Sequence, residues 1–145
     1  MVLVIDIGNS NIKMGLFEHD RLIDSWRLTA TANRASDEYG MLIMDIFKNK
    51  GYDTGDVEGI MISSVVPGMN YSFERLCEYY FGKKPMFVEP GVKTGISIKY
   101  DNPRELGADR IACSLAAYKL YKAPLVTIDF GTATTFNAIS QKKEF

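Results

Sequence analysis

The apolar residues of this chain form short runs separated by turn-forming residues, a pattern typical of strands and helices in a mixed domain. The first run, 2–7, is rich in β-branched residues and predicts a buried strand. The turn residues at 8–11 separate it from a second strand at 12–17, and a third follows at 22–29. Two tight connections in succession predict an antiparallel meander.

Helical spacing of apolar residues appears three times in the rest of the chain. One helix is expected to begin with Ser36 as its cap and to stop at Gly51. A second is expected over 71–81, and a third from Pro103 to about Tyr121. The remaining apolar runs predict strands at 59–66, 85–88, 125–129 and 134–139, with an extended segment at 96–100. Strands first, then strands alternating with helices, predict a mixed α/β domain.

Composition narrows the class of protein. The chain has 145 residues, the usual size of one domain, and 46% of them are hydrophobic, enough for a core. The formal net charge of −1 offers no basic surface for nucleic acid. The apolar runs are too short for a membrane helix or a signal peptide. Cys77, Cys113 and His19 do not have the spacing of a zinc site. We expect a cytoplasmic protein that contacts neither nucleic acid nor membrane.

One short pattern occurs twice. In both copies an apolar strand ends in an aspartate, Asp6 or Asp129, followed by an apolar residue, a glycine and three small residues. The glycine allows a close turn, and the N–H groups that follow can converge on a phosphate oxygen. The carboxylate would hold a cation, or water around one, because it repels phosphate. A single copy could equally be a strand that ends in a turn. Two copies in matching context favour one phosphate-binding hairpin in each of two related lobes.

These hairpins resemble those of the actin-like ATPase superfamily, and within it the chain is most similar to the type III pantothenate kinases. The segments that carry the resemblance are Asp6-Ile-Gly-Asn-Ser-Asn11, Ile62-Ser-Ser-Val-Val-Pro67, Tyr100-Asp-Asn-Pro103, Glu105-Leu-Gly-Ala-Asp-Arg110 and Ile128-Asp-Phe-Gly-Thr-Ala-Thr-Thr135. They occur in the family's order and span nearly the whole chain.

The resemblance implies an α/β fold of the actin-like ATPase (ribonuclease H-like) type, a lobe with a mixed sheet and flanking helices. This first lobe would cover 1–121, and 122–145 would be the start of a truncated second lobe. The residues from Ser140 onward look like the tip of a hairpin, and family members are considerably longer. We therefore expect the chain to be the front part of a kinase and to be inactive by itself.

The reaction implied by the resemblance is transfer of the γ-phosphoryl group of ATP to the primary hydroxyl of pantothenate, the first step toward coenzyme A. The resemblance also implies a homodimer. Its expected ATP-binding residues are Asp6, Gly8, Asn9, Ser10, Asn11, Lys13 and Thr132. Asp6 would also orient Mg²⁺ through water, and Asp129 would bind a monovalent cation, K⁺ or NH₄⁺. Lys13 could instead be a solvated strand lysine.

The substrate side is expected at the Gly-Ala-Asp-Arg segment. By resemblance, Asp109 is the general base that accepts the hydroxyl proton, and Arg110 anchors the pantothenate carboxylate. Tyr100, Gly107 and Ala108 would complete the substrate site. Periodicity alone would favour a surface pair for Asp109 and Arg110.

Two other functions stay open at this point. One is a non-catalytic nucleotide-binding accessory or regulatory relative, and the other is a different small-molecule kinase of the superfamily, such as a sugar kinase.

Overall fold

The computed structural model describes residues 1–89 and 91–145, and these form two compact units, Met1–Phe87 and Val88–Phe145. The first unit contains a five-stranded mixed sheet and two α-helices, and the second contains one α-helix and a two-stranded hairpin. The expected lobes, 1–121 and 122–145, concern the organisation of a whole kinase and stay a prediction. None of the helices in the described residues is long and apolar enough to cross a bilayer.

The sheet of the first unit has the strand order β3-β2-β1-β4-β5. Its strands are β1 (Val2–Ile7), β2 (Asn11–Glu18), β3 (Arg21–Thr29), β4 (Gly59–Ser64) and β5 (Met86–Phe87). The first three strands form the predicted antiparallel meander, while β4 runs parallel to β1 and β5 parallel to β4. The predicted mixed sheet is therefore confirmed, with β1 at its centre.

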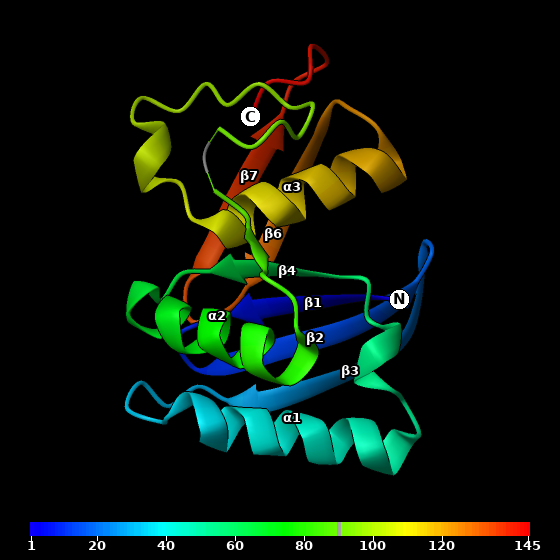
Figure 1. Ribbon diagram of the computed structural model, residues 1–145. Coiled ribbons are helices and arrows are strands. Elements are labelled where there is room, and N and C mark those ends of the chain that lie inside the picture. Colours follow the sequence, from blue (N-terminus) through cyan, green and yellow to red (C-terminus); the bar gives the residue numbers. More distant parts are fainter. Residues whose placement is uncertain (90) are drawn as a thin grey trace. The chain divides into compact units, whose positions relative to one another are not determined.

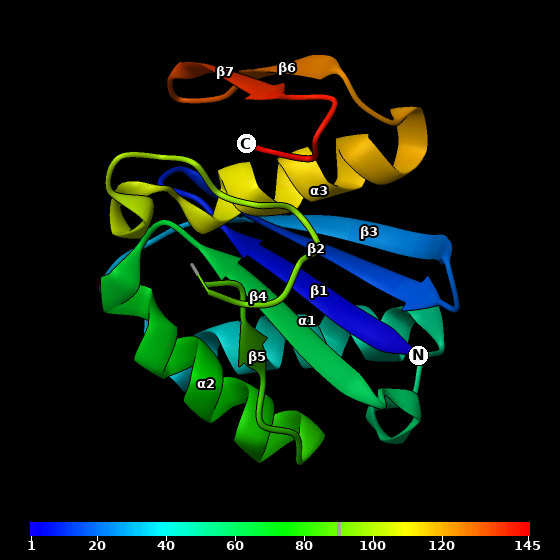
Figure 2. The ribbon, with the colours of Figure 1, turned by 90° about the horizontal axis from the view of Figure 1, so that it is seen from above.

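Helices α1 (Ser36–Lys50) and α2 (Pro67–Phe81) cover the same face of this sheet (Figures 1 and 2). A 3₁₀ turn, Thr54–Asp56, lies between α1 and β4. Alternate side chains of a strand point to opposite faces, so one set of strand residues packs against both helices. Burial of each large apolar side chain stabilises the fold by roughly 1.5–3 kcal/mol. The fully buried side chains of this core include Leu3, Ile5, Ile7, Ile12, Leu16, Tyr39, Ile43, Phe47, Phe73 and Leu76.

The two helices differ from expectation at their N-termini. Ser36 is the first residue of α1, and Ala35 occupies the cap position. The Ala35 N–H donates to the Glu38 carboxylate at 2.8 Å, but its methyl group cannot accept a bond in return. α2 begins four residues earlier than expected, at Pro67, since proline suits the first helical position.

Helices α1 and α2 approach each other closely at Gly40. A methyl group built at this glycine would overlap the ring of Tyr80 from α2. The Tyr80 hydroxyl also lies 3.5 Å from the Asp37 carboxylate, one turn earlier on α1. Gly40 therefore sets the distance between the two helices, although glycine is a poor helix former.

The second unit is built on α3 (Ala108–Tyr121), β6 (Leu125–Phe130) and β7 (Thr134–Ile139). β6 and β7 pair with each other antiparallel, as predicted. α3 packs on one face of this hairpin, the face that carries the buried residues Asn137 and Ile139. The helix does not start at Pro103 as expected. Pro103–Glu105 forms a separate 3₁₀ turn, and α3 begins after the extended residue Gly107.

The segment expected to be extended at 96–100 pairs with the end of the chain. The Ser97 N–H donates to Lys143 O at 2.9 Å, and the Phe145 N–H donates to Ser97 O at 2.8 Å. The turn expected after β7 is present, because the Ser140 N–H donates to Glu144 O at 2.8 Å. The residues after that turn leave β7 and run beside Ser97, so the segment is not a simple hairpin tip.

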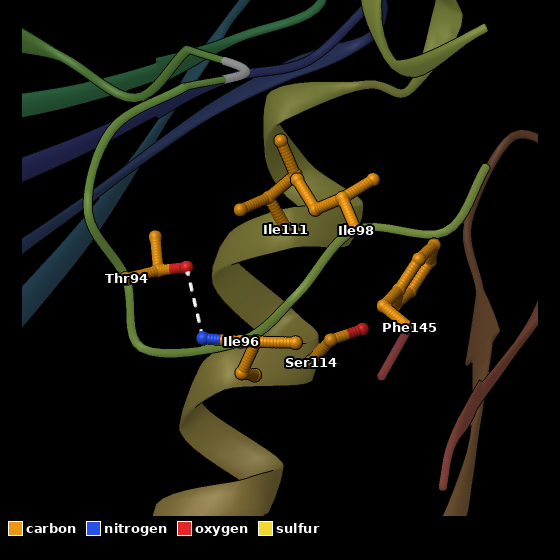
Figure 3. Close-up of a pocket in the computed structure, with 6 residues that line it drawn as sticks. All are labelled: Thr94, Ile96, Ile98, Ile111, Ser114 and Phe145. Carbon is orange, nitrogen blue, oxygen red and sulfur yellow. Dashed lines mark hydrogen bonds between the residues drawn. The ribbon is translucent and has the colours of Figure 1, made fainter. Parts of the chain in front are cut away.

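A small cavity lies where this segment packs on α3 (Figure 3). Its volume is about 10 Å³, room for one water molecule at most. The Ser114 hydroxyl borders it and is buried without a hydrogen-bond partner among the described residues. A space of this size is too small for a substrate group, so the cavity belongs to the packing of the unit. Its lining residues are Thr94, Ile96, Ile98, Ile111, Ser114 and Phe145.

Candidate active site

The first candidate element is the turn between β1 and β2. The last paired residues are Ile7 and Ile12, so residues 8–11 form the turn. The Gly8 N–H donates to Asn11 O at 3.0 Å, and a methyl group at Gly8 would lie only 3.1 Å from that oxygen. The Ser10 carbonyl accepts from the Ala30 N–H at 3.1 Å, which ties the turn to the end of β3. The backbone of the turn is therefore held on both sides.

Asp6 and Lys13 lie directly opposite each other at the base of this turn. They are cross-strand partners, and Lys13 Nζ lies 3.8 Å from Asp6 Oδ2. The Lys13 side chain is 60% exposed and the Asp6 side chain 38% exposed, so water reaches both. Both lie on the sheet face opposite α1 and α2. This geometry suits phosphate binding by the lysine, and it equally suits a solvated lysine in an ion pair.

Ser63 continues this row of polar side chains on β4. It is the parallel-strand partner of Asp6, and its hydroxyl is buried with no hydrogen-bond partner among the described residues. Its position in the sequence indicated no chemical role. It adds a hydroxyl next to Asp6 on the same face of the sheet.

The second candidate element is the turn between β6 and β7. Phe130 pairs with Thr134, so only residues 131–133 form the turn, and the Gly131 N–H donates to Ala133 O at 3.2 Å. This turn is one residue shorter than the first. Thr132 lies exposed within it. The cross-strand partner of Asp129 is Thr135, where the first hairpin has a lysine. The two repeats therefore form similar hairpins with different partners for their aspartates.

The Gly-Ala-Asp-Arg segment forms the N-terminus of α3. Gly107 is the cap, and Ala108 is buried, so its side chain does not face solvent. Asp109 lies in the first turn, where the helix dipole favours a negative charge. Its Oδ1 accepts the N–H of Arg110 at 2.7 Å. Among the described residues Oδ2 has no such partner.

The guanidinium group of Arg110 is held within the second unit. Its Nε donates to Asn137 Oδ1 at 2.6 Å, and its Nη2 donates to Phe136 O at 3.2 Å. The ring centres of Tyr100 and Phe145 lie 5.6 and 5.5 Å from Cζ, within range of a cation–π interaction. The structure thus brings together Tyr100 and Arg110, two of the predicted substrate residues.

Asn137 was missed by the sequence analysis, as was Thr127 behind it. Asn137 Nδ2 donates to Thr127 Oγ1 at 3.1 Å, and the asparagine side chain is only 1% exposed. The sequence pattern does indicate a buried position for Asn137, because it occupies the same face of its predicted strand as Ile139. A polar residue at an inward position needs a buried partner.

Candidate cation ligands are Asp6 and Asp129. The described residues contain no group of three or more His, Cys, Asp or Glu side chains able to hold a metal ion by themselves. Each aspartate lies at the end of a strand beside a turn with hydroxyl or amide oxygens. Such single carboxylates fit hard cations that take their other ligands from phosphate and water.

Solved structures that are similar to this chain define its fold. The chain is similar to the ROK hexokinase from Thermus thermophilus, with a TM-score of 0.55 and 14% identity, covering 97% of this chain and 47% of that one. It is also similar to the inorganic polyphosphate/ATP-glucomannokinase from Arthrobacter sp. strain KM, with a TM-score of 0.50 and 15% identity, covering 98% of this chain and 59% of that one. The fold is therefore that of the actin-like ATPases and sugar kinases, as predicted.

The sequence places the chain more narrowly within this class. The sequence model of the type III pantothenate kinases matches residues 2–145, and the chain belongs to this family. Type III pantothenate kinases of Bacillus cytotoxicus and Myxococcus xanthus are 48% and 49% identical to it over all 145 residues. The chain covers 55% and 57% of their lengths, respectively, so it spans about half the length of the curated relatives it matches.

Proposed function

We propose that this chain is the N-terminal part of a pantothenate kinase, and that the whole protein transfers the γ-phosphoryl group of ATP to the primary hydroxyl of pantothenate. This reaction is the first step of coenzyme A biosynthesis. The observation that carries the proposal is the 47–49% identity over the full 145 residues with relatives named type III pantothenate kinase. The two glycine-containing hairpins and the Asp-Arg pair at a helix N-terminus support it.

ATP phosphates would bind at the two hairpin turns. In the first turn Gly8 permits close approach of the backbone, and Asn9, Ser10 and Asn11 supply donors. Lys13 would add a positive charge, and Thr132 would contact phosphate from the second turn. Phosphoryl transfer has a loose transition state, so its catalysis consists mostly of positioning and charge stabilisation.

Cations would complete the phosphate site. Asp6 would orient Mg²⁺ through water, and Asp129 would bind K⁺ or NH₄⁺. When bound, Mg²⁺ would neutralise the negative charge that develops on the phosphates during transfer. The protein's part is to present one carboxylate at each hairpin.

The acceptor would bind at the N-terminus of α3. The pantothenate hydroxyl oxygen attacks the γ-phosphorus as the bond to the ADP oxygen breaks, and Asp109 accepts the hydroxyl proton through its unpaired Oδ2. Arg110 would bind the pantothenate carboxylate, with Tyr100 beside it. Gly107 and Ala108 would contribute their backbone at the start of the helix.

We also propose a cytoplasmic homodimer, in which 1–121 form the first lobe and 122–145 begin the second. The apolar side chains exposed on the outer face of the β6–β7 hairpin support further covering of this region in the whole protein. They are Val126, Ile128, Phe130 and Phe136.

A substrate panel tests the proposal. The whole protein is incubated with Mg²⁺ and ATP and with pantothenate, glucose or acetate, in buffers containing K⁺, NH₄⁺ or Na⁺ alone. We expect turnover with pantothenate that depends on K⁺ or NH₄⁺. Turnover of glucose in place of pantothenate would identify a sugar kinase. A whole protein without affinity for ATP would be a non-catalytic relative.

A further inference from the structure

The strongest unexplained feature of the second unit is the buried amide behind Arg110. Asn137 is 1% exposed, and its two polar atoms are both used: Oδ1 accepts from Arg110 Nε, and Nδ2 donates to Thr127. The donors fix the orientation of the amide, because Nε can only donate and must face the oxygen. The side chain therefore has one defined arrangement with the guanidinium group.

The groups that contact the guanidinium within the described residues are neutral. They are the Asn137 amide, the Phe136 carbonyl and the rings of Tyr100 and Phe145. Among the described residues Arg110 forms no salt bridge, and the carboxylate of Asp109 accepts the Arg110 backbone N–H. Nη1 makes no hydrogen bond with any residue that the structure describes. The guanidinium is therefore held firmly while its charge is not neutralised.

An arginine held in this way suits an anionic ligand. A carboxylate in place of Asn137 would hold Nε equally well, but it would also cancel the positive charge. A neutral acceptor fixes the side chain and leaves the charge for the ligand. Pre-ordering also lowers the entropy lost when a long side chain binds.

We propose that Asn137, supported by Thr127, is a positioning residue that fixes Arg110 and preserves its charge for the carboxylate of the acceptor substrate. This inference rests on the proposed function. Asn137 itself does not touch the substrate. It acts through Arg110, and it makes the site selective for an acid over a neutral analogue.

The central test replaces Asn137 with Asp in the whole protein. The two side chains have nearly the same shape, and the Thr127 hydroxyl can turn to donate to the new carboxylate, so the fold should be kept. We expect the KM for pantothenate to rise about tenfold, the size of one lost charge-assisted contact, with the KM for ATP and kcat little changed. The neutral primary amide of pantothenate should show no such rise. Asn49→Asp, on the exposed surface of α1, adds the same charge elsewhere and should change neither KM.

A second measurement needs no turnover. In NMR spectra of the whole protein, the Arg110 Nε–H should give a slowly exchanging signal, identified by its loss in Arg110→Lys. Asn137→Leu should abolish this slow exchange, and Asn137→Asp should keep it. A signal unchanged in Asn137→Leu would overturn the positioning role, whether or not pantothenate is the substrate.

The kinetic results separate the remaining possibilities. Equal rises in KM for pantothenate and for its amide in Asn137→Asp would indicate a general structural effect and overturn the proposal. An unchanged KM for pantothenate would overturn it as well. If the wild-type protein does not phosphorylate pantothenate, the proposed function is wrong. The proposal that Asn137 makes the site selective for an acidic substrate is then overturned as well. The NMR result then still decides whether Asn137 fixes Arg110.

Discussion

Lys13 lies directly opposite Asp6 on the neighbouring strand, with its Nζ 3.8 Å from the Asp6 carboxylate. Both side chains are substantially exposed, so water screens their attraction. Exposed ion pairs of this kind stabilise a fold by roughly 0–1 kcal/mol. The pair therefore contributes little to stability, and Lys13 could be either a phosphate ligand or a solvated strand lysine.

Lys13→Met tests this directly. We expect the free energy of unfolding to change by less than about 1 kcal/mol, because the ion pair is exposed. The Kd for ATP should rise about tenfold or more, since a charge-assisted contact to phosphate contributes roughly 1.5–3 kcal/mol. Denaturant unfolding and calorimetric titration with Mg²⁺-ATP measure the two effects. Lys48→Met, at an exposed position of α1, is the control. An unchanged Kd would identify Lys13 as a solvated strand lysine.

Asp109→Asn should separate binding from turnover. Asparagine can still accept the Arg110 N–H through Oδ1, so the N-terminus of α3 should keep its geometry. The amide cannot accept a proton, so kcat for pantothenate should fall about 10²- to 10⁴-fold while the Kd for ATP stays the same. Steady-state kinetics and ATP titration of the whole protein provide both values. Asp20→Asn, in the exposed turn before β3, should leave them unaltered. Near-normal turnover would remove Asp109 from the role of base.

Gly40→Ala should destabilise the first unit although alanine is the better helix former. The added methyl group would overlap the ring of Tyr80 and force α1 and α2 apart. Overpacking of this kind costs about 1–3 kcal/mol. Gly68→Ala is the matched control, because Gly68 lies in α2 with nothing within 4 Å of the new methyl group. That change should be neutral or stabilise by up to about 1 kcal/mol. Denaturant titration compares the two.

A double-mutant cycle shows whether the contact with Tyr80 causes the loss. In the Tyr80→Ala background the penalty of Gly40→Ala should largely disappear, because the ring that it meets is gone. A penalty of equal size in both backgrounds would place the cause elsewhere in α1.

Cys77 should be protected from thiol reagents and should make stability depend on alkaline pH. Its burial in the core of the first unit raises its pKa from 9.0 to about 12. The folded pKa thus lies above the unfolded one, so the stabilising contribution is fully present below pH 9. It is lost as the pH rises from about 9 toward 12. The stability difference between wild type and Cys77→Ala should therefore shrink over that range.

Alkylation with iodoacetamide at pH 8, mapped by peptide mass spectrometry, is a simpler check on the same thiol. Cys77 should stay unmodified in the folded protein and react after unfolding. Cys113 lies half-buried on α3 and should react first. Rapid modification of native Cys77 would contradict its place in the core.

Local sequence patterns predicted the elements that depend on local interactions. The run at 2–7, the meander and the hairpin at 125–139 are confirmed because alternation of side chains and turn residues is visible within a few positions. Helix ends were less accurate. Ser36 was expected as a cap, but the helix includes it and the cap is Ala35, which has no capping side chain. Helix propensity does not reveal that the Glu38 carboxylate accepts a hydrogen bond from the N–H of Ala35 at this helix terminus.

Features that depend on partners distant in sequence could not be predicted. Gly40 looks like a weak point in a helix until the ring of Tyr80 is placed against it. Leu42 has the spacing of a core residue, yet its side chain is 39% exposed. Asn137 has an inward position in its strand, but its partner Arg110 is 27 residues away.

The two hairpins share a sequence pattern but differ in the chemistry opposite their aspartates. Directly opposed side chains in an antiparallel pair lie on the same face, with Cβ atoms about 4.5–5.5 Å apart. In the first hairpin this places an ammonium group, Lys13, across from a carboxylate. With a turn of the same length, the second hairpin would place the phenyl ring of Phe136 across from Asp129. Its turn is one residue shorter, so the hydroxyl of Thr135 lies there instead. One hairpin thus places a positive charge across from its carboxylate, and the other places a neutral threonine there.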